Sequence, residues 1–362
     1  MHTPSGTTSV LTTDERWMAE AIAEATRELG RTGPNPAVGA VLVHGETVVG
    51  RGRYRHGDKH AEIVAMDMAV SAAAGVPFAE CTLYCTLEPH SYQGRNPPCT
   101  DAILARGVGA VVYGCVDPNP RVAGAGIAQL RARIAVRGPV HERACQELIA
   151  DFSLSLREHR PYVVGKAAIS LDGRIATAGG ESQWITGELA RARGRELRAH
   201  AQAIIVGVET VLADDPQLTA RTGEHEPLRV VLDRRLRTPR DAKLVRGPAP
   251  GALLVTSKET VPSEWEGADV WYTGTEPAAV LARLHHELGF TRVLIEGGAQ
   301  VLGSFIAAGL IDELHLFVAP LILGGGPTFV GDYAAASLAD ALHLSLHSSE
   351  LLGADLHLTL RT

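Results

Sequence analysis

The alternation of hydrophobic and polar positions predicts a chain of short helices and strands. In the segment "TTDERWMAEAIAEATRELG", four hydrophobic residues share one helical face: Trp17, Ala21, Ala25 and Leu29. Thr12 and Glu15 form a capping box at its beginning, so we predict an amphipathic helix here. Two Val-rich runs in "AVGAVLVHGETVVGRG" predict a hairpin that turns near Gly45.

The same alternation continues to about residue 155. The segments "HAEIVAMDMAVSAAAG" and "CTDAILARG" are predicted helices, "CTLYCTLEP" and "AVVYGCVDP" are predicted strands, and an αβα stretch follows. This order predicts a sheet covered by helices. The segment "SLREHRPYVVG" then passes from a polar helix end through Pro161 into a new strand. We therefore predict a first domain at residues 1–155 and a second at residues 161–362.

Composition and charge limit the classes of function. A chain of 362 residues suits two domains, and its 45% hydrophobic and 5% aromatic content is typical of an α/β protein. The net charge of −7 argues against nucleic-acid binding, which depends on clustered Lys and Arg. The sequence has no signal-peptide pattern and no run of about 18 apolar residues that could span a membrane. We expect a cytoplasmic homo-oligomer that acts on a small molecule, with no nucleic-acid or membrane partner.

Three short motifs of the first domain carry candidate chemistry. His60 and Glu62 open a predicted helix in "HAE", His90 follows a strand in "LEPH", and Cys99 begins the next helix. A zinc deaminase needs three protein ligands, an open fourth position for water, and a carboxylate that shuttles protons. The H-x-E and P-C-x-x-C motifs of such enzymes supply these groups, and here His90 replaces the first cysteine. The predicted zinc ligands are therefore His60, His90 and Cys99, and Glu62 is the predicted catalytic carboxylate.

One motif of the second domain is compatible with phosphate binding. The segment "RVLIEGGAQVLGSFIAAG" predicts a buried strand, a Gly-Gly turn and a helix. Backbone N–H groups at the start of such a helix can bind a diphosphate because no side chain blocks them. By itself this pattern is weak evidence, since it is not the G-x-G-x-x-G motif.

Several longer stretches resemble one family, the bifunctional riboflavin biosynthesis deaminase-reductases. The first half resembles its deaminase domain in "GRTGPNPAVGAVLV", "KHAE", "TLEPHSYQGRNPPCTDAIL" and "VDPNPRVAGAG". The second half resembles its reductase domain in "KAAISLDGRIATAGGESQWITG", "ADDPQLTAR", "LRVVLDRRLRTP", "LIEGGAQVLGSF" and "DELHLFVAPLILGGG". The resemblance implies a cytidine-deaminase-like three-layer α/β/α domain, followed by a dihydrofolate-reductase-like α/β domain. It also implies zinc-dependent deamination of a diaminopyrimidine phosphoribosylamine and NADPH-dependent reduction of its ribosyl group to ribityl.

The resemblance assigns further residues to substrate and cofactor. Substrate contacts are implied for Asn35, Arg95, Asn119, Ser182, Arg198, Leu218, Arg221 and Glu296. Cofactor contacts are implied for Ala168, Trp184, Thr210, Asp214, Arg234, Gly297, Gly298, Ala299, Gly303 and Ser304. Glu296 is the implied catalytic carboxylate of the reductase, and Arg234, with Arg235 beside it, follows a strand where a 2′-phosphate would favour NADPH over NADH.

The departures from the family pattern cluster in the first domain. The family has P-C-S-H where this chain has Pro89-His90-Ser91-Tyr92, and the histidine of its G-x-G-x-H stretch is missing from "GRGRYRHG". That stretch is also one residue shorter before His60. His90 is either a metal ligand or part of a degraded site, and Cys85 is either a substitute ligand or a buried strand cysteine.

Alternatives therefore remain at two levels. Asn35 is also compatible with a turn between prolines, and Trp184 with a core position. The whole protein is either the bifunctional enzyme, a reductase whose deaminase domain is a scaffold, or a paralogue that acts on a related pyrimidine.

Overall fold

The computed structural model describes residues 11–72, 75–221, 225–260, 263–265 and 268–362. The chain divides into two compact units, Met1–Leu156 and Arg157–Thr362, and each has its own sheet. The division falls inside helix α6 (Ala150–Glu158). No helix among the described residues is long and apolar enough to cross a membrane.

The first unit is built on a five-stranded sheet with the strand order β2-β1-β3-β4-β5. Its strands are β1 (Gly39–His44), β2 (Thr47–Arg53), β3 (Cys81–Leu87), β4 (Ala110–Cys115) and β5 (Ala135–Arg137). Strands β1 and β2 form the predicted hairpin, and Gly45 lies in its turn with a φ of 57°. Strand β1 is also antiparallel to β3, whereas β3, β4 and β5 are parallel.

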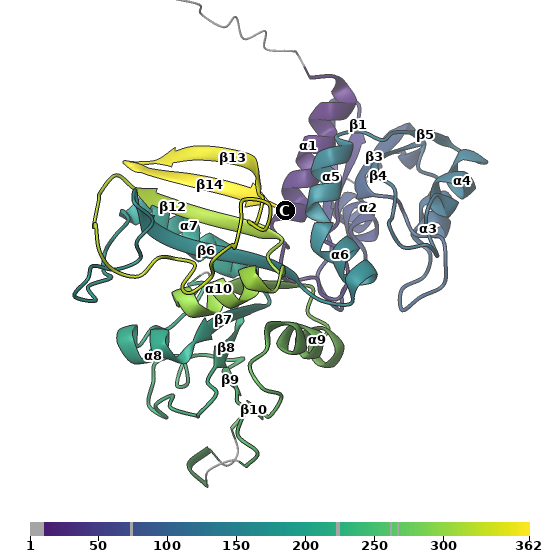
Figure 1. Ribbon diagram of the computed structural model, residues 1–362. Coiled ribbons are helices and arrows are strands. Elements are labelled where there is room, and N and C mark those ends of the chain that lie inside the picture. Colours follow the sequence, from purple (N-terminus) through teal and green to yellow (C-terminus); the bar gives the residue numbers. More distant parts are fainter. Residues whose placement is uncertain (1–10, 73–74, 222–224, 261–262, 266–267) are drawn as a thin grey trace, which may run out of the picture. The chain divides into compact units, whose positions relative to one another are not determined.

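Helices cover both faces of this sheet, as the predicted three-layer fold requires (Figure 1). Residues of α1 (Thr13–Thr26) and α5 (Glu142–Leu148) share one apolar cluster with the sheet, and Trp17 and Met18 belong to it. Residues of α2 (Ala61–Ala72), α3 (Cys99–Ala105) and α4 (Ala125–Arg131) form a cluster on the other face. The capping box of Thr12 and Glu15 begins α1 as predicted.

Glycine and arginine alternate at the end of β2, and the glycines contact α2 on one face of the strand while the arginines pair with acidic residues of α1 and of the following turn on the other face. A Cβ atom at Gly52 would lie 1.9 Å from the carbonyl oxygen of Ala61, so the glycine lets the first turn of α2 lie directly against the strand. The intervening arginines pair with acidic residues of α1 and of the turn after it. The closest pairs are Arg51 with Glu20 at 2.8 Å, Arg53 with Glu28 at 2.7 Å and Arg55 with Glu28 at 3.0 Å, and Glu24 lies 3.2 Å from Arg53.

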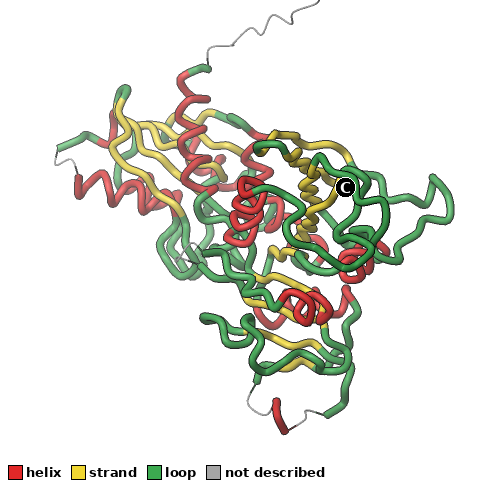
Figure 2. The backbone as a smooth tube through the Cα atoms, turned by 90° about the vertical axis from the view of Figure 1, so that its left-hand side faces the viewer, coloured by secondary structure: helices red, strands yellow, loops and turns green. Residues whose placement is uncertain are grey.

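The second unit contains a nine-stranded sheet with the order β10-β9-β8-β7-β11-β6-β12-β14-β13. Figure 2 shows strands in yellow among the red helices and green loops of the backbone. Its strands are β6 (Tyr162–Ser170), β7 (Ala203–Gly207), β8 (Leu228–Leu232), β9 (Ala252–Val255), β10 (Val270–Trp271), β11 (Arg292–Ile295), β12 (Glu313–Ala319), β13 (Ser345–Leu352) and β14 (Asp355–Arg361). Strands β10 to β12 in this order are parallel, and β14 and β13 add an antiparallel edge. The helices are α7 (Glu188–Ala199), α8 (Val208–Asp214), α9 (Pro277–Leu288) and α10 (Ala299–Ala307). This arrangement agrees with the mixed α/β domain expected from the sequence.

Candidate active sites

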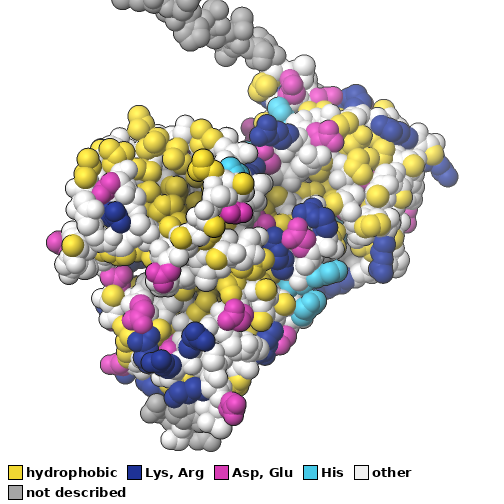
Figure 3. Space-filling view, in the orientation of Figure 1, with side chains coloured by type: hydrophobic (Ala, Val, Ile, Leu, Met, Phe, Trp, Pro, Cys, Tyr) yellow, Lys and Arg dark blue, Asp and Glu magenta, His cyan; other side chains and the backbone are white. Residues whose placement is uncertain are grey.

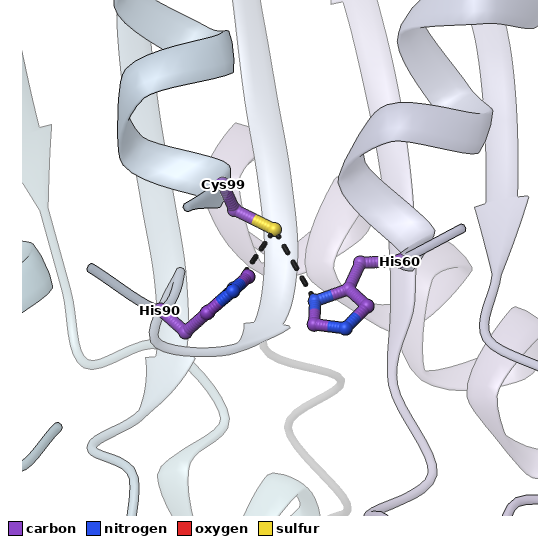
Figure 4. A group of neighbouring side chains, drawn as sticks. All are labelled: His60, His90 and Cys99. Atoms are coloured by element: carbon purple, nitrogen blue, oxygen red, sulfur yellow. Dashed lines mark hydrogen bonds between the residues drawn. The ribbon is translucent and has the colours of Figure 1, made fainter. Parts of the chain in front are cut away.

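The structure brings the three predicted zinc ligands together in the first unit (Figure 4). His60 immediately precedes α2, His90 follows β3, and Cys99 is the first residue of α3. The Cys99 Sγ atom lies 3.1 Å from His90 Nδ1 and 3.4 Å from His60 Nδ1. All three ligand atoms lie within 4.8 Å of one another.

This donor set fits a tetrahedral zinc ion. Zinc bonds of about 2.0–2.3 Å place neighbouring ligand atoms roughly 3.3–3.8 Å apart, which is close to the two distances from Cys99 Sγ to the histidine nitrogens. Burial and His90 lower the pKa of His60 to about 4, so its imidazole is neutral at pH 7, the form that binds metal. Burial raises the pKa of the Cys99 thiol well above its usual range, so its ionisation requires the charge of the metal. Cys85 is fully buried, with its thiol directed at the Val112 carbonyl, and is a core cysteine rather than a ligand.

Glu62 lies beside these ligands in the first turn of α2. Its side chain is almost fully buried, and burial raises the pKa of its carboxyl group. It also accepts a hydrogen bond from the Cys99 thiol, which places it in reach of anything bound at the metal. A carboxyl group with a raised pKa can take up and return a proton near neutral pH.

A cavity of about 200 Å³ is lined by two of the metal ligands, His60 and His90, and by Glu62. Its wall includes the three predicted substrate contacts of the first unit: Asn35, Arg95 and Asn119. It also includes Tyr54, whose hydroxyl oxygen accepts a hydrogen bond from Asn35 at 2.7 Å. Sequence reasoning missed Tyr54, because its partner lies nineteen positions earlier in the chain.

Glu88 is a second residue of this region that sequence reasoning missed. Its buried carboxylate accepts four backbone hydrogen bonds, from the N–H groups of Asp117, Gly124, Gly126 and Ile127, at 2.8–3.3 Å. These N–H groups belong to the loop that carries Asn119 and to the first turn of α4. Glu88 therefore joins the end of β3, two residues before His90, to the loop that contributes Asp117 and Asn119 to the cavity wall.

A larger pocket of about 1170 Å³ lies at the carboxyl ends of β6, β7 and β11 in the second unit, the usual ligand position in parallel sheets. Most of the residues assigned from the resemblance line it: Ala168, Ser182, Trp184, Arg198, Thr210, Asp214, Leu218, Arg221, Glu296, Gly297, Gly298 and Ala299. Trp184 is 69% exposed, so the alternative that it belongs to the core is wrong.

Three of the assigned cofactor residues are not among the described residues that line this pocket: Arg234, Gly303 and Ser304. Arg234 is exposed after β8. A Cβ atom at Gly303 would lie 2.1 Å from the Val330 carbonyl oxygen, so this glycine serves close packing of α10. The Ser304 hydroxyl donates to the Val301 carbonyl within the same helix.

Glu296 stands at the end of β11 between two cations. Arg198 donates to its Oε2 atom at 2.7 Å and also to the Thr219 carbonyl, so the guanidinium holds this carboxylate in place. Lys166 Nζ lies 3.8 Å from Oε1, which has no hydrogen-bond partner among the described residues. Burial lowers the pKa of Lys166. One oxygen of Glu296 is thus left for a ligand in the pocket.

The turn between β11 and α10 fits a dinucleotide. A Cβ atom at Gly297 would lie 2.8 Å from the Val206 side chain, and Gly298 has a φ of 71°. Both positions therefore require glycine, and the turn leaves the N–H groups at the start of α10 uncovered.

Comparison with known proteins identifies both halves of the chain. Residues 11–115 match the cytidine and deoxycytidylate deaminase zinc-binding region, and residues 161–358 match the RibD C-terminal domain. The riboflavin biosynthesis protein RibD of Aquifex aeolicus is 39% identical over 86% of this chain and 88% of its own length. The chain belongs to the RibD family. The RibD protein of Synechocystis is 41% identical over 86% of this chain and 85% of its own length.

A crystal structure from Thermotoga maritima supports the same assignment for the fold. It is described as a diaminohydroxyphosphoribosylaminopyrimidine deaminase and 5-amino-6-(5-phosphoribosylamino)uracil reductase. It matches with a TM-score of 0.86 and 32% identity over 96% of this chain and 98% of that chain. The chain is accordingly a bifunctional deaminase and NADPH-dependent reductase of riboflavin biosynthesis, with a zinc-binding deaminase domain and a small-molecule substrate.

Proposed function

We propose that the first unit deaminates the ring of a diaminopyrimidine phosphoribosylamine with zinc held by His60, His90 and Cys99. The observation that carries this proposal is the cluster of the three ligand atoms within 4.8 Å, beside the buried carboxyl group of Glu62. A degraded site would have no chemical reason to keep these four groups together.

Each residue of the first cavity has a separate task. Zinc, when bound, supplies a positive charge that makes a water molecule acidic enough to attack the ring. Glu62 would transfer the two protons of that water in turn, the first to the ring nitrogen and the second to the amino group, which leaves as ammonia. Asn35 orients the pyrimidine, whereas Arg95 and Asn119 bind the phosphoribosyl part.

The second unit reduces the ribosyl group of the deaminated product. NADPH supplies the hydride, and Gly297 and Gly298 let its diphosphate approach the start of α10. Glu296, held by Arg198, directs its unpartnered oxygen toward the substrate, and Lys166 stands beside it. Orientation of the two reactants supplies most of the rate enhancement, and this step needs no metal.

Metal analysis of His90 variants tests the zinc proposal. Wild-type protein purified from zinc-supplemented medium should hold one zinc ion per chain. His90→Ala should lose this zinc and the deaminase activity but keep reductase activity, whereas His90→Cys should keep the zinc. A wild-type protein without zinc would favour the scaffold alternative, and full zinc in His90→Ala would mean that another residue completes the site.

We also propose that the enzyme works in the cytoplasm as a homo-oligomer. All five cysteines are free thiols, as is usual in a reducing compartment. Hydrophobic side chains gather over β13 and β14, where Leu346 is 61% and Leu351 is 75% exposed (Figure 3). An exposed apolar face on an edge strand is a common site of self-association. Sedimentation of the purified protein tests this, since a monomer at micromolar concentration would contradict it.

A further inference from the structure

Tyr54 occupies a defined place in the deaminase cavity. It follows directly after β2, and its backbone N–H donates to the Val38 carbonyl at 3.0 Å. This bond continues the pairing of the hairpin by one residue, and because side chains alternate along a strand, Tyr54 lies on the same face as Gly52, toward α2. The side chain is only 6% exposed and lines the cavity.

Tyr54 contacts both a metal ligand and a substrate residue. Its ring meets His60 edge to face, with 5.4 Å between the ring centroids. Its hydroxyl pairs with the Asn35 side-chain amide at 2.7 Å. The stretch that supplies it, "GRGRYRHG", is the one from which the histidine of the family is missing.

The pair of Tyr54 and Asn35 presents one donor and one acceptor to the cavity. When the Asn35 Nδ2 atom donates to the hydroxyl oxygen, the amide oxygen is left as an acceptor and the hydroxyl proton as a donor. In the reverse pairing, the amide N–H is the donor and a hydroxyl lone pair is the acceptor. Tyr54 is buried whereas Asn35 is exposed, so a ligand that covers this pair without pairing with it leaves the Tyr54 hydroxyl unsatisfied and cuts the Asn35 amide off from water, which is costly.

We propose that Tyr54 is a specificity-determining residue of the deaminase site. Together with Asn35 it selects pyrimidines whose ring edge has an N–H or amino donor next to a carbonyl or ring-nitrogen acceptor. The proposal rests on the proposed function of the first unit, because it concerns the substrate of that site.

The test is the substitution Tyr54→Phe, which keeps the ring against His60 and removes the hydroxyl. Binding of the diaminopyrimidine phosphoribosylamine is measured by calorimetry in a Glu62→Gln background, so that the ligand is not consumed. The dissociation constant should rise about tenfold to thirtyfold, as expected for a lost hydrogen bond in a buried site. Asn35→Ala should weaken binding similarly, and the double variant should be little weaker than either single variant, because the two residues act as one unit.

Tyr84→Phe is the matched control. It also loses one hydroxyl hydrogen bond, to Asp14 at 2.8 Å, but lies outside the cavity, so binding should not change. Equal binding by Tyr54→Phe and the parent would overturn the proposal, as would additive effects in the double variant. Should Tyr54→Phe fail to fold, the Asn35→Ala variant decides, since unchanged binding there would also overturn it. Zinc content and turnover of the wild-type protein are measured separately, so failure of the zinc proposal would be seen there and not in these affinities.

Discussion

The buried carboxylate of Glu88 offers a sharp test of how the deaminase cavity is held together. Its Oε1 atom accepts from the N–H groups of Gly126 and Ile127, and its Oε2 atom accepts from Asp117 and Gly124. In Glu88→Gln one oxygen becomes an NH₂ group. Whichever way the amide turns, this NH₂ group faces two backbone donors, so no orientation of glutamine can satisfy all four.

The magnitude follows from the bonds that are lost. Hydrogen bonds to a charged group contribute about 1.5–3 kcal/mol each, and two of the four are removed. The sum is about 3–6 kcal/mol, and relaxation of the loop brings the expected cost to the lower end, roughly 3 kcal/mol. Since about 1.4 kcal/mol corresponds to a factor of ten, opening of this loop should become roughly a hundred times more frequent.

Hydrogen exchange followed by mass spectrometry measures this opening directly. Peptides that cover residues 116–131 should exchange roughly a hundredfold faster in Glu88→Gln, whereas peptides of the second unit should be unchanged. Glu46→Gln is the control, because Glu46 is a surface residue of the same unit whose side chain is 72% exposed and pairs only with Arg16 in the described structure. Exchange within about threefold of wild type in Glu88→Gln would refute the role given to this carboxylate.

Three further predictions concern the two pockets. Glu296→Gln should bind NADPH with nearly unchanged affinity but reduce the substrate at least a hundredfold more slowly. If the single-turnover rate of this variant equals that of the wild type, Glu296 has no role in the reaction. Burial raises the pKa of Asp117 to about 6, so its contribution to stability is present below the unfolded pKa of about 3.9 and is lost as the pH rises through 6. The free energy of unfolding of Asp117→Asn, relative to that of the wild type, should therefore be about 2 kcal/mol larger at pH 7.5 than at pH 4, because only the wild type must ionise a buried carboxyl group. A difference in urea denaturation that does not change with pH would exclude this. Arg234→Ala should leave the KM for NADPH within about twofold because Arg234 lies outside the pocket, whereas Lys243→Ala should raise this KM because Lys243 lines the pocket wall. A raised KM in Arg234→Ala and an unchanged KM in Lys243→Ala would support the prediction from the sequence that Arg234 binds the cofactor.

Sequence patterns predicted many helices and turns correctly because these elements depend on interactions between residues that are close in the chain. The capping box at Thr12 and the hairpin turn at Gly45 involve neighbouring residues, and both are present. The order of the nine-stranded sheet could not be predicted in this way, since β11 lies between β6 and β7 although it comes far later in the chain. The two-residue strand β10 is too short to produce any periodicity.

In the deaminase site too, residues within short motifs could be predicted, whereas contacts between residues far apart in the chain could not. The spacing of the zinc motif indicated His60, His90 and Cys99, because three short segments carry recognisable neighbours. Glu88 stands in one of those segments, yet its role depends on N–H groups 29 to 39 positions away. The contact between Tyr54 and Asn35 likewise exists only once the hairpin has formed.

The ion pairs between β2 and the region of α1 have a consequence for how this cavity can evolve. Four residues of a helix rise about 6.0 Å and two residues of a strand about 6.6–6.8 Å, so the charges remain aligned over three successive pairs: Arg51 with Glu20, Arg53 with Glu24 and Arg55 with Glu28. A shift of the strand by one residue would turn the arginines toward α2, and a shift by two would leave one arginine and one glutamate at the ends of the series without a partner. The strand is therefore locked in register, and Tyr54, between Arg53 and Arg55, is held facing the cavity. Insertions and deletions in residues 56–59, between the paired Arg55 and His60, would therefore change the chain next to the cavity without breaking the ion pairs that hold the tyrosine.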